Sequence, residues 1–152
     1  MYCVPSKPID VEREISYHED VLQAIIESYG YTAKKVEEAV ALGYEGLVDN
    51  QLTGVSISMG AGMCNIAVMY QGMTALSFAV SRGGDWIDNN VSMDTGVPVA
   101  KVTNIKETSN QLDLTKGVIQ DIYGEGSEEY AVMHALRSYY GALVTYLLTN
   151  LK

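Results

Sequence analysis

The centre of the chain carries a short glycine-rich segment, Gly60-Ala61-Gly62, with Ser58 before it and Met63 after it. A turn between two buried strands that contains glycines can bring backbone N–H groups against a ligand without side-chain obstruction, which suits phosphate oxygens. For this tripeptide alone, an ordinary hairpin turn is the simpler interpretation. Phosphate binding is therefore a hypothesis that the surrounding residues must support.

Three apolar runs around this segment predict strands, because apolar and polar residues alternate along them. Val55, Ile57 and Met59 alternate with serines, and two further runs follow at residues 66–70 and 76–80. Tight turns between neighbouring runs favour three adjacent antiparallel strands. A second glycine motif, Gly83-Gly84-Asp85, then precedes a predicted helix.

The flanking regions predict further elements. A short strand is expected to end near residue 4, before Pro5. Ser16 and Glu19 have capping-box spacing at the start of a helix that we expect Gly30 to end. Residues 36–42 are predicted as a strand and residues 44–50 as a short helix. Helices are also predicted at residues 99–108 and 117–123, and a long final helix is expected after Ser127, a good N-cap.

The composition favours a soluble globular chain. Among its 152 residues, 47% are hydrophobic and 19% charged, and the formal net charge is −9. This charge argues against nucleic acid as a partner, because binding to phosphate backbones requires clustered Lys and Arg. The two cysteines do not form a disulfide framework, no apolar run is long enough for a membrane span, and a cytoplasmic location is expected.

Residues 55–89 as a whole resemble the second phosphate-binding segment of the actin superfamily, which includes MreB and DnaK-type chaperones. The turn Gly60-Ala61-Gly62, the strand Asn65-Ile66-Ala67-Val68 and the helix entry Gly83-Gly84-Asp85-Trp86-Ile87-Asp88 match its parts in order. A joint match over about 35 residues is more specific than one motif. The resemblance implies an α/β, ribonuclease H-like (actin-like ATPase) fold: a mixed sheet with flanking helices, here a partial domain.

The resemblance also implies roles for single residues. Backbone groups of residues 60–63 would contact the phosphates of ATP, and residues 83–85 would shape the wall of the cleft. Glu38 matches a family Glu that orients the attacking water, although Ala39 replaces the usual proline; a solvated charge is the alternative. Lys106 matches a residue that contacts ribose, with a solvated surface lysine as the alternative. Residues 1–54 would then be the end of a first lobe with its linking helix, and residues 55–152 a second-lobe core with a small helical insertion.

The departures from the family pattern lower the expected activity. Ser58 stands where the family has an Asp that holds the Mg²⁺-bound water network, so Ser58 becomes the candidate metal-contacting residue, without a charge. Met63 and Cys64 replace two threonines. The family's first-lobe phosphate loop and its adenine-contacting strand are not found in this sequence. The chain is therefore expected to bind nucleotide but not to hydrolyse ATP as this fragment.

Two other functions remain open. A catalytically degenerate module of the same fold would act in self-assembly into filaments or in partner binding, and the seven Met and eleven Tyr residues could serve such a surface. A sugar or acetate kinase of this fold is less favoured, because residues 83–88 resemble the actin and chaperone branch.

Overall fold

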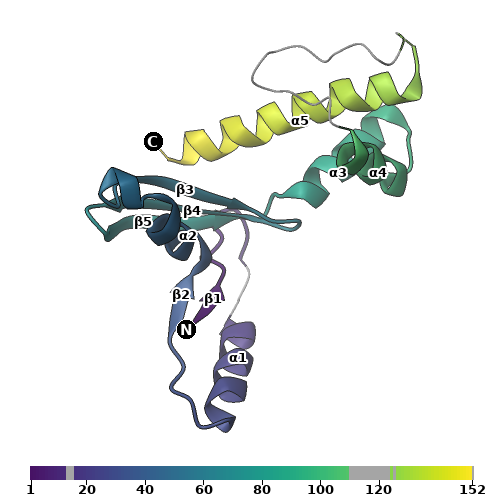
Figure 1. Cartoon of the computed structure of the whole chain (residues 1–152). Coiled ribbons are helices and arrows are strands. Elements are labelled where there is room, and N and C mark those ends of the chain that lie inside the picture. Colours follow the sequence, from purple (N-terminus) through teal and green to yellow (C-terminus); the bar gives the residue numbers. More distant parts are fainter. Residues whose placement is uncertain (13–15, 110–123, 125, 152) are drawn as a thin grey trace. The chain divides into compact units, whose positions relative to one another are not determined.

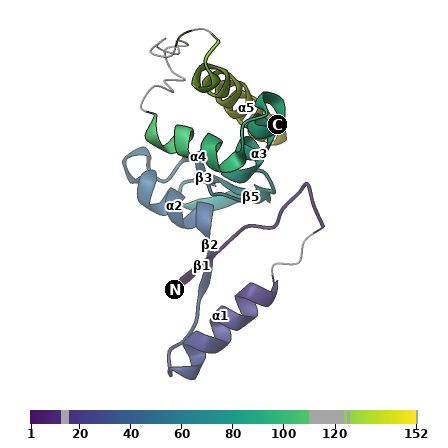
Figure 2. The same ribbon diagram turned by 90° about the vertical axis from the view of Figure 1, so that its right-hand side faces the viewer.

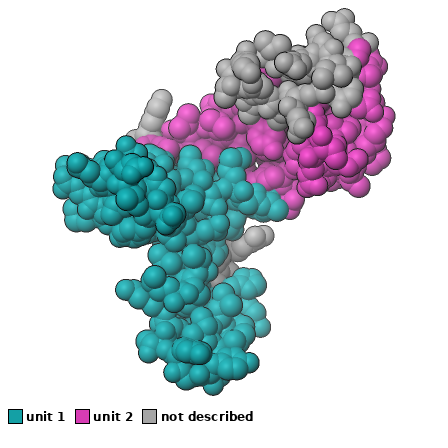
Figure 3. Space-filling view, viewed as in Figure 1, with its two compact units in different colours: residues 1–81 teal, residues 82–152 magenta. Residues whose placement is uncertain are grey.

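The computed structural model describes residues 1–12, 16–109, 124 and 126–151. The chain divides into two compact units, Met1–Ser81 and Arg82–Lys152, which Figure 3 shows in separate colours. The first unit contains all the strands found in the described ranges, and the second consists of helices.

The first unit begins with a parallel strand pair. Strand β1 (Tyr2–Val4) pairs with β2 (Lys35–Glu37), and helix α1 (Ser16–Ser28) lies between them in sequence (Figure 1). Parallel neighbours need a crossover connection, which α1 supplies. The predicted strand and helix are confirmed, and Gly30 adopts a left-handed φ of 81° just beyond the helix. The capping role predicted for the Ser16 side chain lies outside the described part.

The strand predicted at residues 36–42 is confirmed only at Val36 and Glu37, which lie in β2, and is wrong from Glu38 onward. The chain is extended only as far as Glu37 (φ −69°, ψ 138°), and helix α2 (Glu38–Gly46) follows at once, succeeded by the 3₁₀ helix η1 (Val48–Asn50). The buried residues Ala39 and Gly43 are four positions apart, which places them on one helical face. The helix predicted at residues 44–50 is therefore shifted, and its place is taken by the end of α2 and η1.

The three central strands are confirmed. Strands β3 (Gly54–Met59), β4 (Cys64–Tyr70) and β5 (Met73–Val80) form an antiparallel sheet in the order β3-β4-β5. Gln71 (φ 50°) and Gly72 (φ 78°) both have positive φ in the tight turn between β4 and β5, as a type I′ hairpin turn requires. Ser58, Asn65 and Ala79 lie opposite one another across the sheet, so their side chains share one face.

Helix α2 packs against this face of the sheet, as Figures 1 and 2 show from two sides. The contact is close because small residues line it: Ala39 and Ala67 are fully buried. A Cβ atom on Gly43 would lie 2.3 Å from the sulfur of Met69. Ser56 donates a hydrogen bond of 2.5 Å to the carbonyl of Ala39. These contacts hold the first turn of α2 directly over the sheet.

The segment after β1 runs along the outer edge of β5. Pro8 forms a parallel bridge with Ala79, while Ile9 N–H donates to the Ala79 carbonyl and Ala79 N–H to the Lys7 carbonyl. Pro8 has no N–H to extend this pairing. The expected α/β class is confirmed, but the described strands form a two-stranded parallel sheet and a three-stranded antiparallel sheet rather than one continuous mixed sheet.

The second unit packs three helices together: α3 (Gly84–Thr95), α4 (Val99–Thr108) and α5 (Glu128–Asn150). The helix predicted at residues 99–108 is confirmed. Ser127 caps α5 by accepting a hydrogen bond of 3.1 Å from the Tyr130 N–H, also as predicted. The helix predicted at residues 117–123 lies outside the described residues. No helix in the described ranges has the length and apolar character needed to cross a membrane.

Candidate functional site

The first turn of α2 and the end of β3 bring together two of the residues singled out in the sequence. The Ser58 hydroxyl donates a hydrogen bond of 2.6 Å to Glu38 Oε1. Asn65, opposite Ser58 on β4, donates one of 3.2 Å from Nδ2 to Glu38 Oε2. Both oxygens of the Glu38 carboxyl group therefore have a donor, and its orientation is defined.

The neighbouring Glu37 is held in a similar way. Ser6 donates a hydrogen bond of 3.0 Å to Glu37 Oε2, and the Ser77 hydroxyl donates a short one to the same oxygen. The Ser6 N–H in turn donates to Asn65 Oδ1 over 2.9 Å. A connected polar network thus runs from the segment after β1, under the start of α2, to β3, β4 and β5.

The network is buried on one side and open on the other. Asn65 and Ser6 are 2% and 1% exposed, whereas Glu38 is exposed and Ser58 half-buried. Buried polar groups without partners destabilise a fold, so the hydrogen bonds of Asn65 and Ser6 stabilise this arrangement. The exposed side of the network is the side that a ligand can reach.

The glycine turn follows Ser58 directly. The Gly60 N–H donates to the Met63 carbonyl over 2.9 Å, which closes the loop between β3 and β4. Ala61 and Gly62 are exposed at its tip. A Cβ on Gly60 would lie 3.3 Å from the Met63 carbonyl oxygen, while one on Gly62 would meet nothing within 4 Å. The amides of residues 61–63 are therefore the ones this turn can present to a phosphate, and the fold itself does not require glycine at Gly62.

The remaining sequence-predicted residues belong to the second unit. Gly83 is the buried N-cap of α3, with an extended backbone (φ −148°, ψ −152°), and Gly84 and Asp85 form the first turn. The Gly83 carbonyl accepts a bond of 3.3 Å from the Ile87 N–H. Gly83, Gly84 and Asp85 thus open a helix, as the motif predicted.

Lys106 is engaged within the second unit. Its ammonium lies 2.8 Å and 2.7 Å from the two carboxylate oxygens of Asp88 on α3. The Thr103 hydroxyl donates a further bond of 2.8 Å to Asp88 Oδ2. Asp88 is 3% exposed, so this ion pair joins α3 to α4 in a largely buried setting. A structural role for Lys106 is visible, whereas its ribose contact stays a prediction.

The oxygens at the first site fit a magnesium ion only in part. Ser58 Oγ and Glu38 Oε1 are hard oxygen donors, the type that Mg²⁺ prefers. Within the described residues, no group of three or more His, Cys, Asp or Glu side chains could hold a metal by itself. Mg²⁺ commonly keeps several waters and binds through one or two protein oxygens together with substrate phosphates. The donor set fits that mode and does not form a complete protein cage.

Sequence reasoning missed four members of the network, including Glu37, which accepts from Ser6 and Ser77. Asn65 was noticed only as the first residue of a matching strand, and Ser6 and Ser77 were not singled out. One signal was available: Asn65 is a polar residue in a strand whose next two residues, Ile66 and Ala67, are apolar. A buried amide in such a strand requires partners. The partners themselves lie 27 and 59 positions away, at Glu38 and Ser6.

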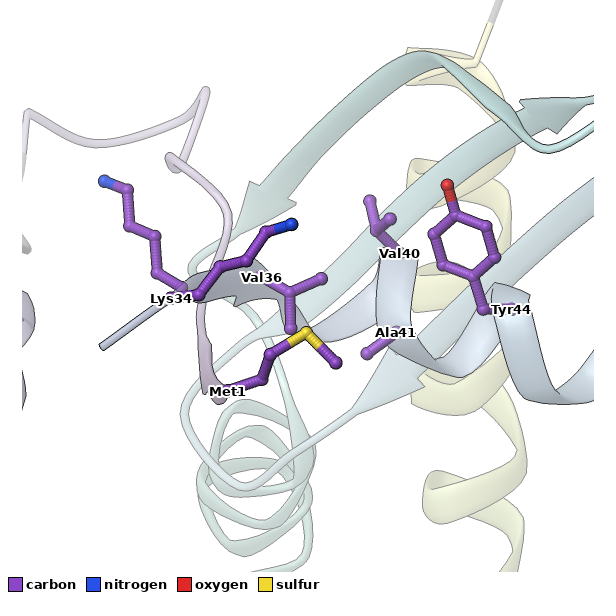
Figure 4. Close-up of a pocket in the computed structure, with 7 residues that line it drawn as sticks. Met1, Lys34, Val36, Val40, Ala41 and Tyr44 are labelled. Atoms are coloured by element: carbon purple, nitrogen blue, oxygen red, sulfur yellow. The ribbon is translucent and has the colours of Figure 1, made fainter. Parts of the chain in front are cut away.

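A cavity of about 530 Å³ lies between residues of β2 and α2 (Figure 4). Val36, Val40 and Ala41 form its apolar wall, and Tyr44 lies at one end. The Tyr44 hydroxyl donates to the Gly72 carbonyl over 2.8 Å. None of the residues that carry the predicted phosphate site lines this cavity.

Comparison with known proteins identifies one similar solved structure and the family of this chain. The structure is similar to the crystal structure of ethanolamine utilization protein EutJ from Carboxydothermus hydrogenoformans, with a TM-score of 0.55 at 18% sequence identity. The similarity covers 86% of this chain and 42% of that chain, so this chain spans less than half the length of EutJ. At this identity the similarity concerns the fold alone, which is of a coarse actin-like type. The chain belongs to the Volactin family, which it matches over residues 1–152. No curated protein gives a significant match.

Proposed function

We propose that this chain binds the phosphate groups of a nucleotide, ATP with Mg²⁺, at the turn between β3 and β4. The observation that carries the proposal is the hydrogen bond of 2.6 Å between Ser58 and Glu38, directly before the glycine turn. Two residues that match separate segments of the family pattern, one as metal-contacting and one as water-orienting, thus meet beside the proposed phosphate-binding amides.

Each part of the site has a distinct role in this proposal. The amides of residues 61–63 donate to phosphate oxygens, and their fixed dipoles act locally, so the net negative charge of the chain does not prevent binding. Ser58 contributes an oxygen to Mg²⁺, which would offset phosphate charge when bound. For Gly83-Gly84-Asp85, as part of the nucleotide-site wall, and for Lys106, as a ribose contact, the family resemblance is the sole support.

Glu38 is proposed to orient a water molecule for attack on the terminal phosphate. Its carboxyl group is exposed and fixed by two donors, which suits a positioning role. Phosphoryl transfer depends mainly on positioning and on charge stabilisation around the phosphate. Ser58 and Asn65 are neutral, so we propose nucleotide binding with slow or absent turnover for this chain, inside a cytoplasmic ATPase-type protein.

A displacement titration tests the proposal. A fluorescent ATP analogue is bound to the protein with Mg²⁺ and then displaced by ATP, ADP or adenosine. If phosphate contacts carry the binding, then ATP and ADP displace the analogue and adenosine does not, and chelation of Mg²⁺ weakens the binding. Equal displacement by adenosine, or no binding at millimolar nucleotide, would sink the proposal.

One observation favours assembly as a second function. Helix α1 exposes an apolar stripe in which Val21, Leu22 and Ile25 are 39%, 41% and 50% exposed. Exposed apolar stripes of this kind commonly mark protein interfaces. Sedimentation of the protein with and without nucleotide, compared with the Ile25→Glu variant, tests this function: assembly that the variant retains unchanged would exclude α1 as the interface.

A further inference from the structure

The side-chain amide of Asn65 makes hydrogen bonds with both of its ends. Its Oδ1 atom accepts from the Ser6 N–H over 2.9 Å, and its Nδ2 atom donates to Glu38 Oε2 over 3.2 Å. The side chain is 2% exposed and lies in the central strand of the three-stranded sheet. It therefore connects the backbone after β1 to the carboxyl group at the start of α2.

The amide satisfies both neighbours at this position, whereas an aspartate or an apolar side chain does not. An ionised carboxylate accepts hydrogen bonds but donates none, so an aspartate in place of Asn65 would put an acceptor against the acceptor Glu38. An apolar side chain would leave the Ser6 N–H without its partner in a buried setting. The donor and acceptor pattern of Asn65 thus matches its two neighbours atom by atom.

We propose that Asn65 is a positioning residue, which fixes the carboxyl group of Glu38 through the hydrogen bond between Nδ2 and Oε2. Ser58 holds the other oxygen of the same carboxyl group, but Ser58 lies near the end of β3 and is half-buried. Asn65, in contrast, is 2% exposed and is itself held by the Ser6 N–H. The role of the oriented carboxyl group in nucleotide chemistry rests on the function proposed above.

Exchanging the donor and the acceptor between Asn65 and Glu38 tests the hydrogen bond that joins them. The Asn65→Asp variant opposes two carboxyl groups, and its urea unfolding midpoint is expected to fall. Adding Glu38→Gln restores a donor opposite an acceptor, because the introduced glutamine amide can donate to the introduced carboxylate while its carbonyl oxygen accepts from Ser58. The Ser6 N–H keeps an acceptor in both variants, and the midpoint of the double variant is expected to recover. Failure of the second substitution to restore the midpoint contradicts the proposed pairing.

The positioning role needs a readout that stability alone does not change. Side-chain ¹³C relaxation of Glu38 reports whether its rotamer is fixed. We expect Asn65→Ala to make this side chain mobile, while Tyr44→Phe, which removes a hydrogen bond of α2 away from Glu38, leaves it ordered. A Glu38 side chain that stays equally rigid in Asn65→Ala would overturn the proposal.

A nucleotide-binding measurement distinguishes failure of this inference from failure of the proposed function. If the wild-type chain binds Mg²⁺–ATP, then Asn65→Ala is expected to weaken the Mg²⁺-dependent binding about tenfold, because it releases the Glu38 carboxylate that lies beside the proposed Mg²⁺ contact Ser58. Tyr44→Phe is expected to leave this binding unchanged. If the wild-type chain binds no nucleotide, the proposed function fails, and the relaxation of Glu38 still decides whether Asn65 positions it. Unchanged nucleotide affinity in Asn65→Ala, with wild-type binding intact, contradicts a functional role for the positioning.

Discussion

Ser58 at the end of β3 donates a hydrogen bond of 2.6 Å to Glu38 at the start of α2, although the two residues lie 20 positions apart in the chain. The contact exists because α2 packs closely on the small side chains of the sheet and because Ser58 faces that helix. Ser58 lies just before the glycine turn, so this contact places the Glu38 carboxyl group beside the proposed phosphate-binding turn.

A substitution at Gly62 distinguishes an effect on the fold from an effect on ligand binding. A Cβ atom at Gly62 meets nothing within 4 Å, so Gly62→Ala is expected to keep the fold and to change the free energy of unfolding by less than about 1 kcal/mol. The same Cβ would obstruct a phosphate approaching the turn amides, and nucleotide affinity is expected to fall about tenfold. Calorimetric titration measures the affinity.

Gly46→Ala is the matched control for this change. Gly46 is also exposed, and a Cβ there also meets nothing within 4 Å. Its replacement at the end of α2 should leave nucleotide affinity unchanged. If both alanine variants bind as tightly as the wild type, the turn does not contact the phosphates.

Ser58→Asp changes the charge at the proposed metal position. The new carboxylate would lie beside that of Glu38, and without divalent cations we expect the free energy of unfolding to fall by about 1–2 kcal/mol. A bound Mg²⁺ would offset this repulsion, so the melting temperature of the variant should rise with Mg²⁺ more than that of the wild type. Ser58→Asn is the uncharged control, and an identical Mg²⁺ response in all three proteins would argue against a metal position here.

The ion pair between Asp88 and Lys106 is expected to matter for stability. Asp88→Ala leaves the Lys106 ammonium without its partner in a setting where that side chain is only 18% exposed, and we expect a loss of about 3 kcal/mol in unfolding free energy. Lys101→Ala, which removes an exposed pair with Glu128, is the control and should cost less. Urea unfolding compares them; equal losses would show that burial of the Asp88 pair adds nothing.

The two cysteines are expected to differ in reactivity. Cys3 is exposed and Cys64 is buried, and burial raises the pKa of the Cys64 thiol to about 11. Because the thiolate is the nucleophile, iodoacetamide should label Cys3 well before Cys64, as mass spectrometry of the peptides can measure. Labelling of both at one rate would contradict the burial of Cys64.

The raised pKa of Cys64 also fixes a direction for the pH dependence of stability. The folded chain favours the neutral thiol, so this contribution is complete below about pH 9, the usual thiol value, and is lost as the pH rises towards about 11. The Cys64→Ala variant removes the group and should show a smaller decline over that range. An equal decline in both proteins would assign it to other groups.

The sequence predicted the elements whose signals are local. The alternation around Val55 and Ile57, the cap at Ser127 and the glycine at Gly30 each depend on neighbouring residues, and the structure confirms the strands and helices that they indicated. The strand predicted at residues 36–42 failed because Val36 and Val40 favour extended structure locally, while packing of Ala39 and Gly43 on the sheet decides for a helix.

The site was predictable only in part for a related reason. Glu38 and Ser58 were found through resemblance to a family, not from their contact, which depends on how α2 and β3 pack. Asn65 and Ser6 meet across 59 positions of sequence, and no local pattern specifies such a pair. Lys106 and Asp88 were both named from the sequence, Asp88 within a glycine motif, but nothing in the sequence indicated that they would form an ion pair.

Amide chemical-shift mapping tests the central claim most directly. In a ¹⁵N-labelled chain titrated with Mg²⁺–ATP, we predict that the largest shift changes fall on the amides of Ala61, Gly62 and Met63. The amide of Gly60 should change less, because it already donates to the Met63 carbonyl. Saturating changes elsewhere, with the signals of residues 61–63 unmoved, would contradict a phosphate site at this turn.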